Sequence, residues 1–211
     1  MPSFVRFFQY PVPLDERERW LRYLVQSYQT TMNDLGVETW IMHGTLIGWY
    51  RNRKILPFDH DGDVQMTEES LSWLADHHNA TIHAFRSHER TYLLDINPQH
   101  VKDSLEDVNN PVDGRWIDTS NGMWLDITSV RPHPGPAEQE EPVLRTKFGH
   151  QYAIGDIYPL QKTDFEGVPT LVPAKAEELL VRQYGEGILT QTAYKGYRWD
   201  PKTKLWVKDQ A

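Results

Sequence analysis

The sequence contains no cysteine, no apolar stretch long enough to cross a bilayer and no surplus of basic residues. Without cysteine, the chain forms no disulfides, zinc–thiolate sites or cysteine nucleophiles, and this absence fits a reducing compartment such as the cytoplasm. The net charge of −8 argues against general nucleic-acid binding, which needs a basic face. The opening residues, MPSFVRFFQYPVPLDERER, contain no run typical of a signal peptide or a membrane span.

The composition that remains is that of a globular protein. Charged residues make up 25% of the chain and hydrophobic residues 39%, so an ordinary buried core is expected. A length of 211 residues suits one domain, or one domain with appendages.

One stretch, residues 41–66, organises the rest of the chain. It reads IMHGTLIGWYRNRKILPFDHDGDVQM. A short apolar run ends at His43-Gly44-Thr45, and a helix-like turn over residues 46–50 follows. A basic segment then precedes a group of aspartates. This order of elements predicts a ligand site rather than a simple core segment.

Asp59, Asp61 and Asp63 are spaced two residues apart, which places them on one face if the segment is a strand. Like charges on one face repel, raise each other's pKa and reduce stability, and a divalent cation removes that repulsion. We therefore expect a metal site, with a merely solvated acidic turn as the alternative. An EF-hand calcium loop is excluded, because its glycine position falls on Val64 and its glutamate position on Ser70.

Gly44 and Thr45 lie between the predicted strand of residues 37–42 and the helix-like turn. A glycine there allows close approach of the backbone to a ligand, and the helix N-terminus offers free N–H groups to a phosphate. The basic segment comprises Arg51, Arg53 and Lys54, and at least one of these is expected to face the acids and bind donor phosphate. For each of these three residues, a position in a solvated loop is the alternative. His43 is a further candidate for contact with a ligand, with a local hydrogen bond as the alternative.

Local patterns predict the remaining elements. A helix over Leu14–Leu35 has an apolar stripe, a capping box of Asp15 with Glu18, and Gly36 as its stop. The other expected elements are a helix at 67–78 capped by Thr67, strands at 81–85 and 91–96, a hairpin of 115–119 with 123–130 around Asn121-Gly122, short strands within 163–172 around Glu166-Gly167, and a helix at 173–184 with proline in its first turn and Gly185 after its end.

Three further segments are predicted to be a loop, a mobile excursion and a tail. Residues 104–114 form an acidic loop, and residues 131–142 are too rich in proline and glutamate to bury anything, which predicts a mobile excursion. Residues 188–211 are a polar tail in which Tyr197, Trp199 and Trp206 pack on the domain, with sugar stacking as the alternative.

Asp126 lies between Leu125 and Ile127, a pattern that predicts a carboxylate in a buried strand. Since a buried acid without a partner is costly, Asp126 is expected either as a third acid of the metal site or in a structural salt bridge. Asp118, across the predicted hairpin, is a candidate for indirect support of the site.

The stretch HGTLIGWYRNRKILPFDHDGDVQM closely resembles the LicD-type phosphotransferases, the group that includes the fukutin-related proteins. Their signature is GTLLG, a short basic segment and PWDxDxD, so Phe58 stands where tryptophan is usual. Further agreement comes from RWID at 115–118, LDI at 125–127, IYPL at 157–160 and FEG at 165–167. The resemblance implies a single catalytic domain over 1–211 with its core at about 35–185, preceded by the N-terminal helix (1–34) and followed by a tail (186–211).

The resemblance also implies a fold and an activity. The fold is an α/β (α+β) nucleotidyltransferase-like mixed sheet that carries the acids on one edge face, with flanking helices behind. The activity is metal-dependent transfer of a phospho-alcohol or phospho-sugar from a CDP- or GDP-linked donor to a glycan hydroxyl. Two alternatives stay open: a regulatory relative without turnover, and a nucleotide- or glycan-binding module with a structural cation. A Golgi location applies if the chain is a piece of a longer secretory-pathway protein.

Site roles follow from that implied chemistry. Mg²⁺ or Mn²⁺ suits the oxygen ligands of Asp61, Asp63 and Asp126, with Asp59 as an orienting ligand of less importance. Asp126 is also expected to take the proton from the acceptor hydroxyl. Gly44, Thr45, Asp61, Asp63 and Asp126 should therefore converge on one cleft.

Overall fold

The computed structural model describes residue 7 and residues 11–209, apart from 102–111, 134–142 and 148. The helices of these residues are α1 (Leu14–Leu35), α2 (His43–Asn52), α3 (Glu68–His78), α4 (Ile154–Ile157), α5 (Ala176–Tyr184) and a 3₁₀ helix, η3 (Glu186–Leu189). The strands are β1 (Trp40–Ile41), β2 (Gly62–Thr67), β3 (Ile82–Phe85), β4 (Arg90–Ile96), β5 (Gly114–Asp118), β6 (Trp124–His133), β7 (Val143–Thr146), β8 (Gln151–Ala153), β9 (Gln161–Phe165), β10 (Val168–Val172), β11 (Ala193–Tyr194), β12 (Tyr197–Asp200) and β13 (Leu205–Lys208).

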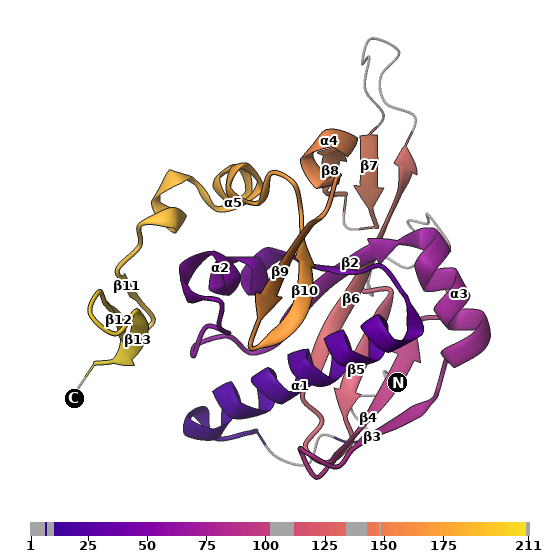
Figure 1. The fold of residues 1–211 in the computed structure, drawn as a ribbon, viewed down its shortest axis with the longest axis horizontal. Helices are drawn as coiled ribbons and strands as arrows, with labels where there is room; N and C mark the ends of the chain where they lie inside the picture. Colours follow the sequence, from indigo (N-terminus) through magenta and orange to yellow (C-terminus); the bar gives the residue numbers. More distant parts are fainter. Residues whose placement is uncertain (1–6, 8–10, 102–111, 134–142, 148, 210–211) are drawn as a thin grey trace.

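The main sheet has the strand order β1-β2-β6-β5-β4-β3, and β7 joins the far end of β6 and pairs with β8. The pair β2 and β6 is parallel, whereas the other pairs of this sheet are antiparallel. In Figure 1, α1 crosses in front of this sheet and α3 lies at its side. The mixed sheet with its helices confirms the predicted α/β class.

Helix α1 has the predicted bounds because its apolar stripe is long and its stop is a glycine. Gly36 adopts the left-handed conformation (φ 69°), and its N–H donates to the last turn of the helix. The predicted capping box is wrong, since Pro13 occupies the N-cap and no side chain caps the helix. Buried Tyr28 and Leu24 pack on the sheet, and the indole N–H of Trp116 donates to Ser27 Oγ at 2.9 Å.

Several other local predictions are confirmed. Thr67 caps α3 by accepting the Ser70 N–H at 3.1 Å, and β5 and β6 form the hairpin around Asn121-Gly122. Strands β9 and β10 pair around Glu166-Gly167, where both residues have positive φ.

The predicted boundaries differ from the structure in three places. Strand β1 has only two residues because it pairs with β2 only there. Helix α5 begins at Ala176, so Pro173 lies before its first turn. Residues 131–133, assigned to a mobile excursion, extend β6 and pair with β7; the rest of that segment, and most of the predicted loop at 104–114, lie outside the described residues.

The two faces of the sheet carry different side chains, because paired residues share a face and successive residues alternate. Trp116 pairs with Leu125 on the face that contacts α1. Arg115 and its partner Asp126 therefore lie on the opposite face, together with Asp63, which is in register with Asp126. Asp118 shares the face of Trp116 and pairs with Arg90 at 3.5 Å. The suggestion that Asp118 supports the acidic site is thus wrong.

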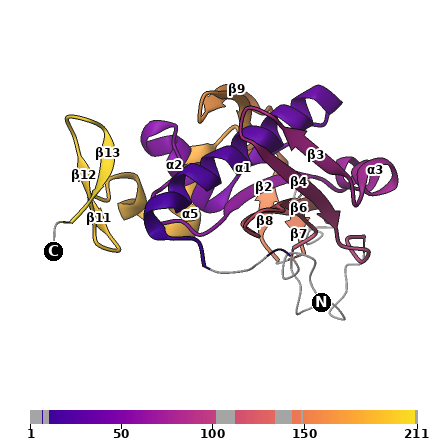
Figure 2. The same cartoon turned by 90° about the horizontal axis from the view of Figure 1, so that it is seen from below.

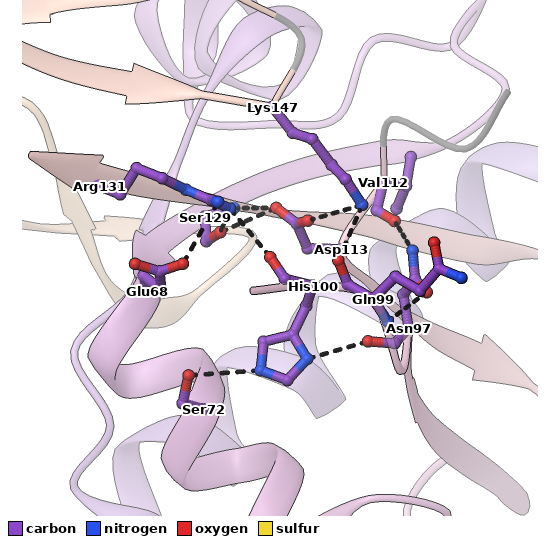
Figure 3. Close-up of polar contacts among 10 residues, drawn as sticks. All are labelled: Glu68, Ser72, Asn97, Gln99, His100, Val112, Asp113, Ser129, Arg131 and Lys147. Atoms are coloured by element: carbon purple, nitrogen blue, oxygen red, sulfur yellow. Dashed lines mark hydrogen bonds and ion pairs between the residues drawn. The ribbon is translucent and has the colours of Figure 1, made fainter. Parts of the chain in front are cut away.

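A buried polar cluster ties the loop before β5 to the sheet and to α3 (Figure 3). The carboxylate of Asp113, fully buried, accepts hydrogen bonds from the N–H and the Oγ of Ser129 and lies 3.7 Å from Lys147 Nζ. Arg131 donates to the His100 carbonyl at 2.9 Å and pairs with Glu68 at 3.3 Å. Because these charges are paired inside the fold, the cluster holds segments together. None of the helices in the described residues combines the length and apolarity needed to cross a bilayer.

The second glycine of the GTLIG motif has a packing role that can be tested. A Cβ on Gly48 would lie 2.3 Å from the carbonyl oxygen of Lys54. Gly48→Ala must push the end of α2 away from residues 54–56, so we expect a loss of about 1–3 kcal/mol of unfolding free energy in chemical denaturation.

Gly155→Ala is the matched control, because a Cβ there meets nothing within 4 Å. It should be neutral or stabilise the chain by roughly 0.4–1 kcal/mol. Equal stability of the two variants would contradict the packing role of Gly48.

Candidate active site

Four carboxylates gather at one end of β2, on the sheet face opposite α1. Asp63 and Asp126 are brought together by the parallel register of β2 and β6, in which they are partners. Asp59 and Asp61 lie in the loop before β2, although the spacing of the acids predicted a strand. The strand begins only at Gly62, because that is where pairing with β6 starts.

The aspartates interact in spite of this loop. Burial, the larger cause, and the Asp61 charge, the second, raise the pKa of Asp59 to about 7. For Asp61, burial and, next in size, the Asp126 charge raise the pKa to about 6. Burial, followed by its three carboxylate neighbours, raises the pKa of Asp63 well above its usual value. The cluster therefore carries the mutual repulsion that the sequence pattern predicted.

The first turn of α2 meets this cluster. Gly44 and Thr45 lie within that turn, not in a loop before it. The Gly44 N–H donates to the Asp63 carboxylate and lowers its pKa. The buried Thr45 Oγ1 accepts the Asp63 N–H at 2.8 Å. The helix N-terminus thus stabilises Asp63 through the free N–H groups and dipole that the sequence suggested for a phosphate.

Asp126 has a direct cationic partner. Arg115 Nε donates to its Oδ1 at 2.8 Å across the β5–β6 pair. Burial raises the pKa of Asp126, and the Arg115 charge opposes that shift. The salt bridge that the sequence left as an alternative is therefore present. Asp126 nevertheless also lies near Asp61 and Asp63, since its charge raises their pKa values.

A cavity of about 450 Å³ opens over the acids. Gly44, Asp59, Asp61 and Asp63 line one side of it. The remaining wall includes residues from the end of α5, from η3 and the loop after it, and from the C-terminal strands and their first turn, namely Tyr184, Ile188, Gln191, Tyr194, Lys195 and Trp206. Asp126 and Thr45 are not among the lining residues, although both contact or neighbour residues that are.

The basic segment is divided between two places. Arg51 lines the acidic cavity. Arg53 and Lys54 line a separate cavity of about 460 Å³, next to Arg22 and Glu166. This division arises because Arg53 ends α2 in the left-handed conformation (φ 64°) and its carbonyl accepts the Glu166 N–H of the β9–β10 turn. The structure therefore brings Arg51 to the acids but not Arg53 or Lys54.

The oxygen atoms of the aspartates are the type of ligand that a hard cation such as Mg²⁺ prefers. All candidate ligands are carboxylate oxygens, and in the described residues no group donates a hydrogen bond to the buried Oδ2 of Asp59. In the same described residues, no group of three or more His, Cys, Asp or Glu side chains is arranged so that it could by itself hold a metal ion. Mg²⁺ is commonly held by one or two carboxylates, with the remaining positions filled by water and substrate phosphates.

Sequence reasoning missed three site residues. Lys195 comes from the segment interpreted as a tail, and its charge lowers the pKa of Asp59. Tyr184 ends the predicted helix at 173–184, and burial together with the Asp63 and Asp59 charges raises the pKa of its hydroxyl. Arg115 was noted only as part of a motif, although the β5–β6 hairpin prediction implied its pairing with Asp126. His43 Nδ1 lies 3.0 Å from Gln183 Oε1, so its hydrogen-bond partner is a residue distant in the chain and not the local one left open for it.

The bond between Thr45 and Asp63 provides a test of how the site is held. Thr45→Val removes the acceptor and leaves the Asp63 N–H unpaired, so we expect faster amide exchange at Asp63 and a loss of about 1–3 kcal/mol in stability. Thr45→Ser keeps the hydroxyl and should retain slow exchange. Native-state hydrogen exchange by NMR measures both, and wild-type protection of Asp63 in Thr45→Val would contradict the assignment.

Comparison with known proteins identifies relatives with two kinds of printed function. The chain is 26% identical to Mannosyltransferase regulator 4 of Saccharomyces cerevisiae over 137 residues, which cover 63% of this chain and 12% of that protein. It is 26% identical to the yeast Mannosyltransferase regulator 14 over 153 residues, 72% of this chain and 16% of the relative. The human Ribitol-5-phosphate transferase FKTN is 44% identical over 41 residues, 19% of this chain and 9% of that protein.

The chain thus spans less than a fifth of the length of each of these relatives. The sequence model of the LicD/FKTN/FKRP nucleotidyltransferase domain matches residues 36–175, more than half of the chain. That region contains α2, β2, β5, β6 and the loop before β2, which together carry the four aspartates, Gly44 and Arg115. The chain belongs to the LicD/FKTN/FKRP family and contains its nucleotidyltransferase domain.

Proposed function

We propose that the chain is a metal-dependent phosphotransferase that moves a phospho-alcohol or phospho-sugar from a CDP- or GDP-linked donor to a glycan hydroxyl. The observation that carries the proposal is the group of mutually repelling carboxylates on the floor of a cavity, with a buried Asp59 oxygen that lacks a hydrogen-bond donor in the described residues. Membership of the family supports the reaction class, and the transferase name of the human relative agrees with it.

Asp61 and Asp63, with Asp59 beside them, would hold Mg²⁺ or Mn²⁺. A bound divalent cation neutralises the charge of a transferring phosphoryl group and of the leaving phosphate. The Gly44 N–H and Thr45 keep Asp63 in place at the head of α2. Arg51 lines the cavity, and it is the member of the basic segment that we propose to bind a donor phosphate. Arg53, Lys54 and the Thr45 hydroxyl remain candidates only for indirect contributions to phosphate binding.

Asp126 is the proposed proton acceptor for the attacking hydroxyl. It approaches from β6, a different strand from that of Asp63, and Arg115 fixes its Oδ1. A carboxylate held in this way is oriented for proton transfer without moving.

A non-catalytic role is the second candidate, and the two yeast relatives favour it by their printed name of regulator. A regulator of this fold, or a nucleotide- or glycan-binding module with a structural cation, would bind a nucleotide without releasing a product. All four aspartates are present, whereas a relative that had lost turnover would be expected to have lost an acid, and this favours catalysis over the regulatory role.

The central test is turnover with a purified chain. We expect hydrolysis or transfer of CDP- or GDP-linked donors that depends on Mg²⁺ or Mn²⁺ and stops with chelator. Asp63→Asn should abolish this activity and weaken metal-nucleotide binding, because it removes a charged oxygen ligand. Ser72 lies on α3, away from the acids, so Ser72→Ala is a control that should keep turnover. Nucleotide binding without any product in the wild type would establish the non-catalytic alternative.

The division of labour between Asp126 and Asp59 is a separate test. Asn has nearly the same shape as Asp but neither accepts the proton nor balances charge. Asp126→Asn should therefore keep the fold and donor affinity while losing roughly 10²–10⁴ in kcat. Asp59→Asn should lose less, as expected for an orienting residue. The measurements are kcat by steady-state kinetics and donor affinity by calorimetry for both variants. A larger loss of kcat in Asp59→Asn than in Asp126→Asn would reverse the assignment of the two roles.

A further inference from the structure

The C-terminal strands β11–β13 form a small antiparallel sheet of their own, and they lie beyond the residues that match the family. The sequence pattern predicted only a polar tail here, with aromatic side chains that pack on the domain. Figures 1 and 2 show this sheet at the end of the molecule beside α2, away from the main sheet. It lies there because of specific contacts with the acidic motif and the end of α2.

Phe58, which precedes Asp59 directly, is the main anchor for this small sheet. Its ring, only 8% exposed, contacts Tyr194, Tyr197 and Trp206 at centroid distances of 5.0, 5.6 and 5.3 Å. An aromatic side chain at this position thus attaches the C-terminal sheet to the loop that carries the acids.

The end of α2 supplies further anchors. The Arg51 guanidinium lies 4.4 Å above the Trp199 ring, and it donates to the Leu189 carbonyl. Asn52 Nδ2 donates to the Lys204 carbonyl at 2.8 Å. The predicted packing of Trp199 and Trp206 on the domain is therefore confirmed, and these contacts hold the C-terminal sheet over the cavity.

Lys195 is the cation that this arrangement brings to the acids. It lies with Gly196 in the two-residue turn between β11 and β12, and both residues have positive φ, as this kind of hairpin turn requires. Lys195 lines the cavity, and its charge lowers the pKa of both Asp59 and Asp61. The hairpin thus places an ammonium group opposite the carboxylates.

We infer that the C-terminal sheet completes the donor site: Lys195 binds the diphosphate of a nucleoside diphosphate, and the aromatic wall formed by Tyr194 and Trp206 contacts its base or ribose. The inference rests on the proposed function in assigning a nucleotide to this cavity. A cavity of about 450 Å³ is within the usual range for such a ligand. The carboxylates alone repel a diphosphate, so a cation on the cavity wall favours its binding.

The experiment compares two lysines of the same small sheet. Lys204 is exposed and has a positive φ in the β12–β13 turn, as Lys195 does in its own turn, but it does not line the cavity. Its contact with Asn52 uses only its backbone carbonyl. Lys195→Ala and Lys204→Ala therefore impose the same backbone strain, and only the first removes a cavity charge.

The measurement is calorimetric binding of CDP and of GDP to the full chain with Mg²⁺. Lys195→Ala should weaken binding about tenfold or more, the range for a hydrogen bond to a charged group. Lys204→Ala should bind as the wild type does, and Lys195→Arg should retain most of the affinity.

Unchanged affinity in Lys195→Ala, an equal loss in Lys204→Ala, or no binding of either nucleotide by the wild type would overturn the inference. Turnover is a separate readout. Binding that depends on Lys195 without any product would refute the proposed reaction and leave the assignment of Lys195 standing. Turnover by Lys195→Ala with the KM of the wild type would refute the assignment of Lys195 and leave the proposed reaction standing.

Discussion

The parallel pairing of β2 with β6 is the contact on which the site depends. It places Asp63 directly beside Asp126, and the antiparallel β5 then adds Arg115 as the next neighbour. A parallel pair needs a long crossover connection, and here that connection is α3 with strands β3 to β5. Much of the fold therefore serves to bring two short segments, distant in the chain, into one register.

Electrostatic repulsion is the cost of this arrangement, and the fold offsets it locally. Asp63 receives the Gly44 N–H at the head of α2, and Asp126 receives Arg115. Asp59 and Asp61 have the Lys195 charge nearby. Each partner comes from a different element, so the cluster is compensated only when α2, β5 and the C-terminal sheet are all in place. We propose that a bound ligand neutralises this unfavourable charge.

The family comparison and the geometry contribute different information. The matched region contains the acids and their immediate supports, whereas β11–β13 and most of the outer cavity wall lie outside it. The relatives include proteins named as regulators and as a transferase, so similarity alone does not choose between those roles. If the proposed function holds, the residues outside the matched region contribute to the choice of donor, because they form that wall of the cavity.

Local features of the sequence determined much of this protein. The apolar stripe before Gly36, the Thr67 cap and the Asn121-Gly122 and Glu166-Gly167 turns depend on interactions within a few residues, and they appear in the structure as predicted. The spacing of the acids likewise identified a repelling group. Tertiary structure alone decided that Asp126 pairs with Arg115, that Arg53 and Lys54 face another cavity, and that Lys195 meets the acids. These outcomes depend on strand register and on packing between distant segments, which residue spacing along the chain does not encode.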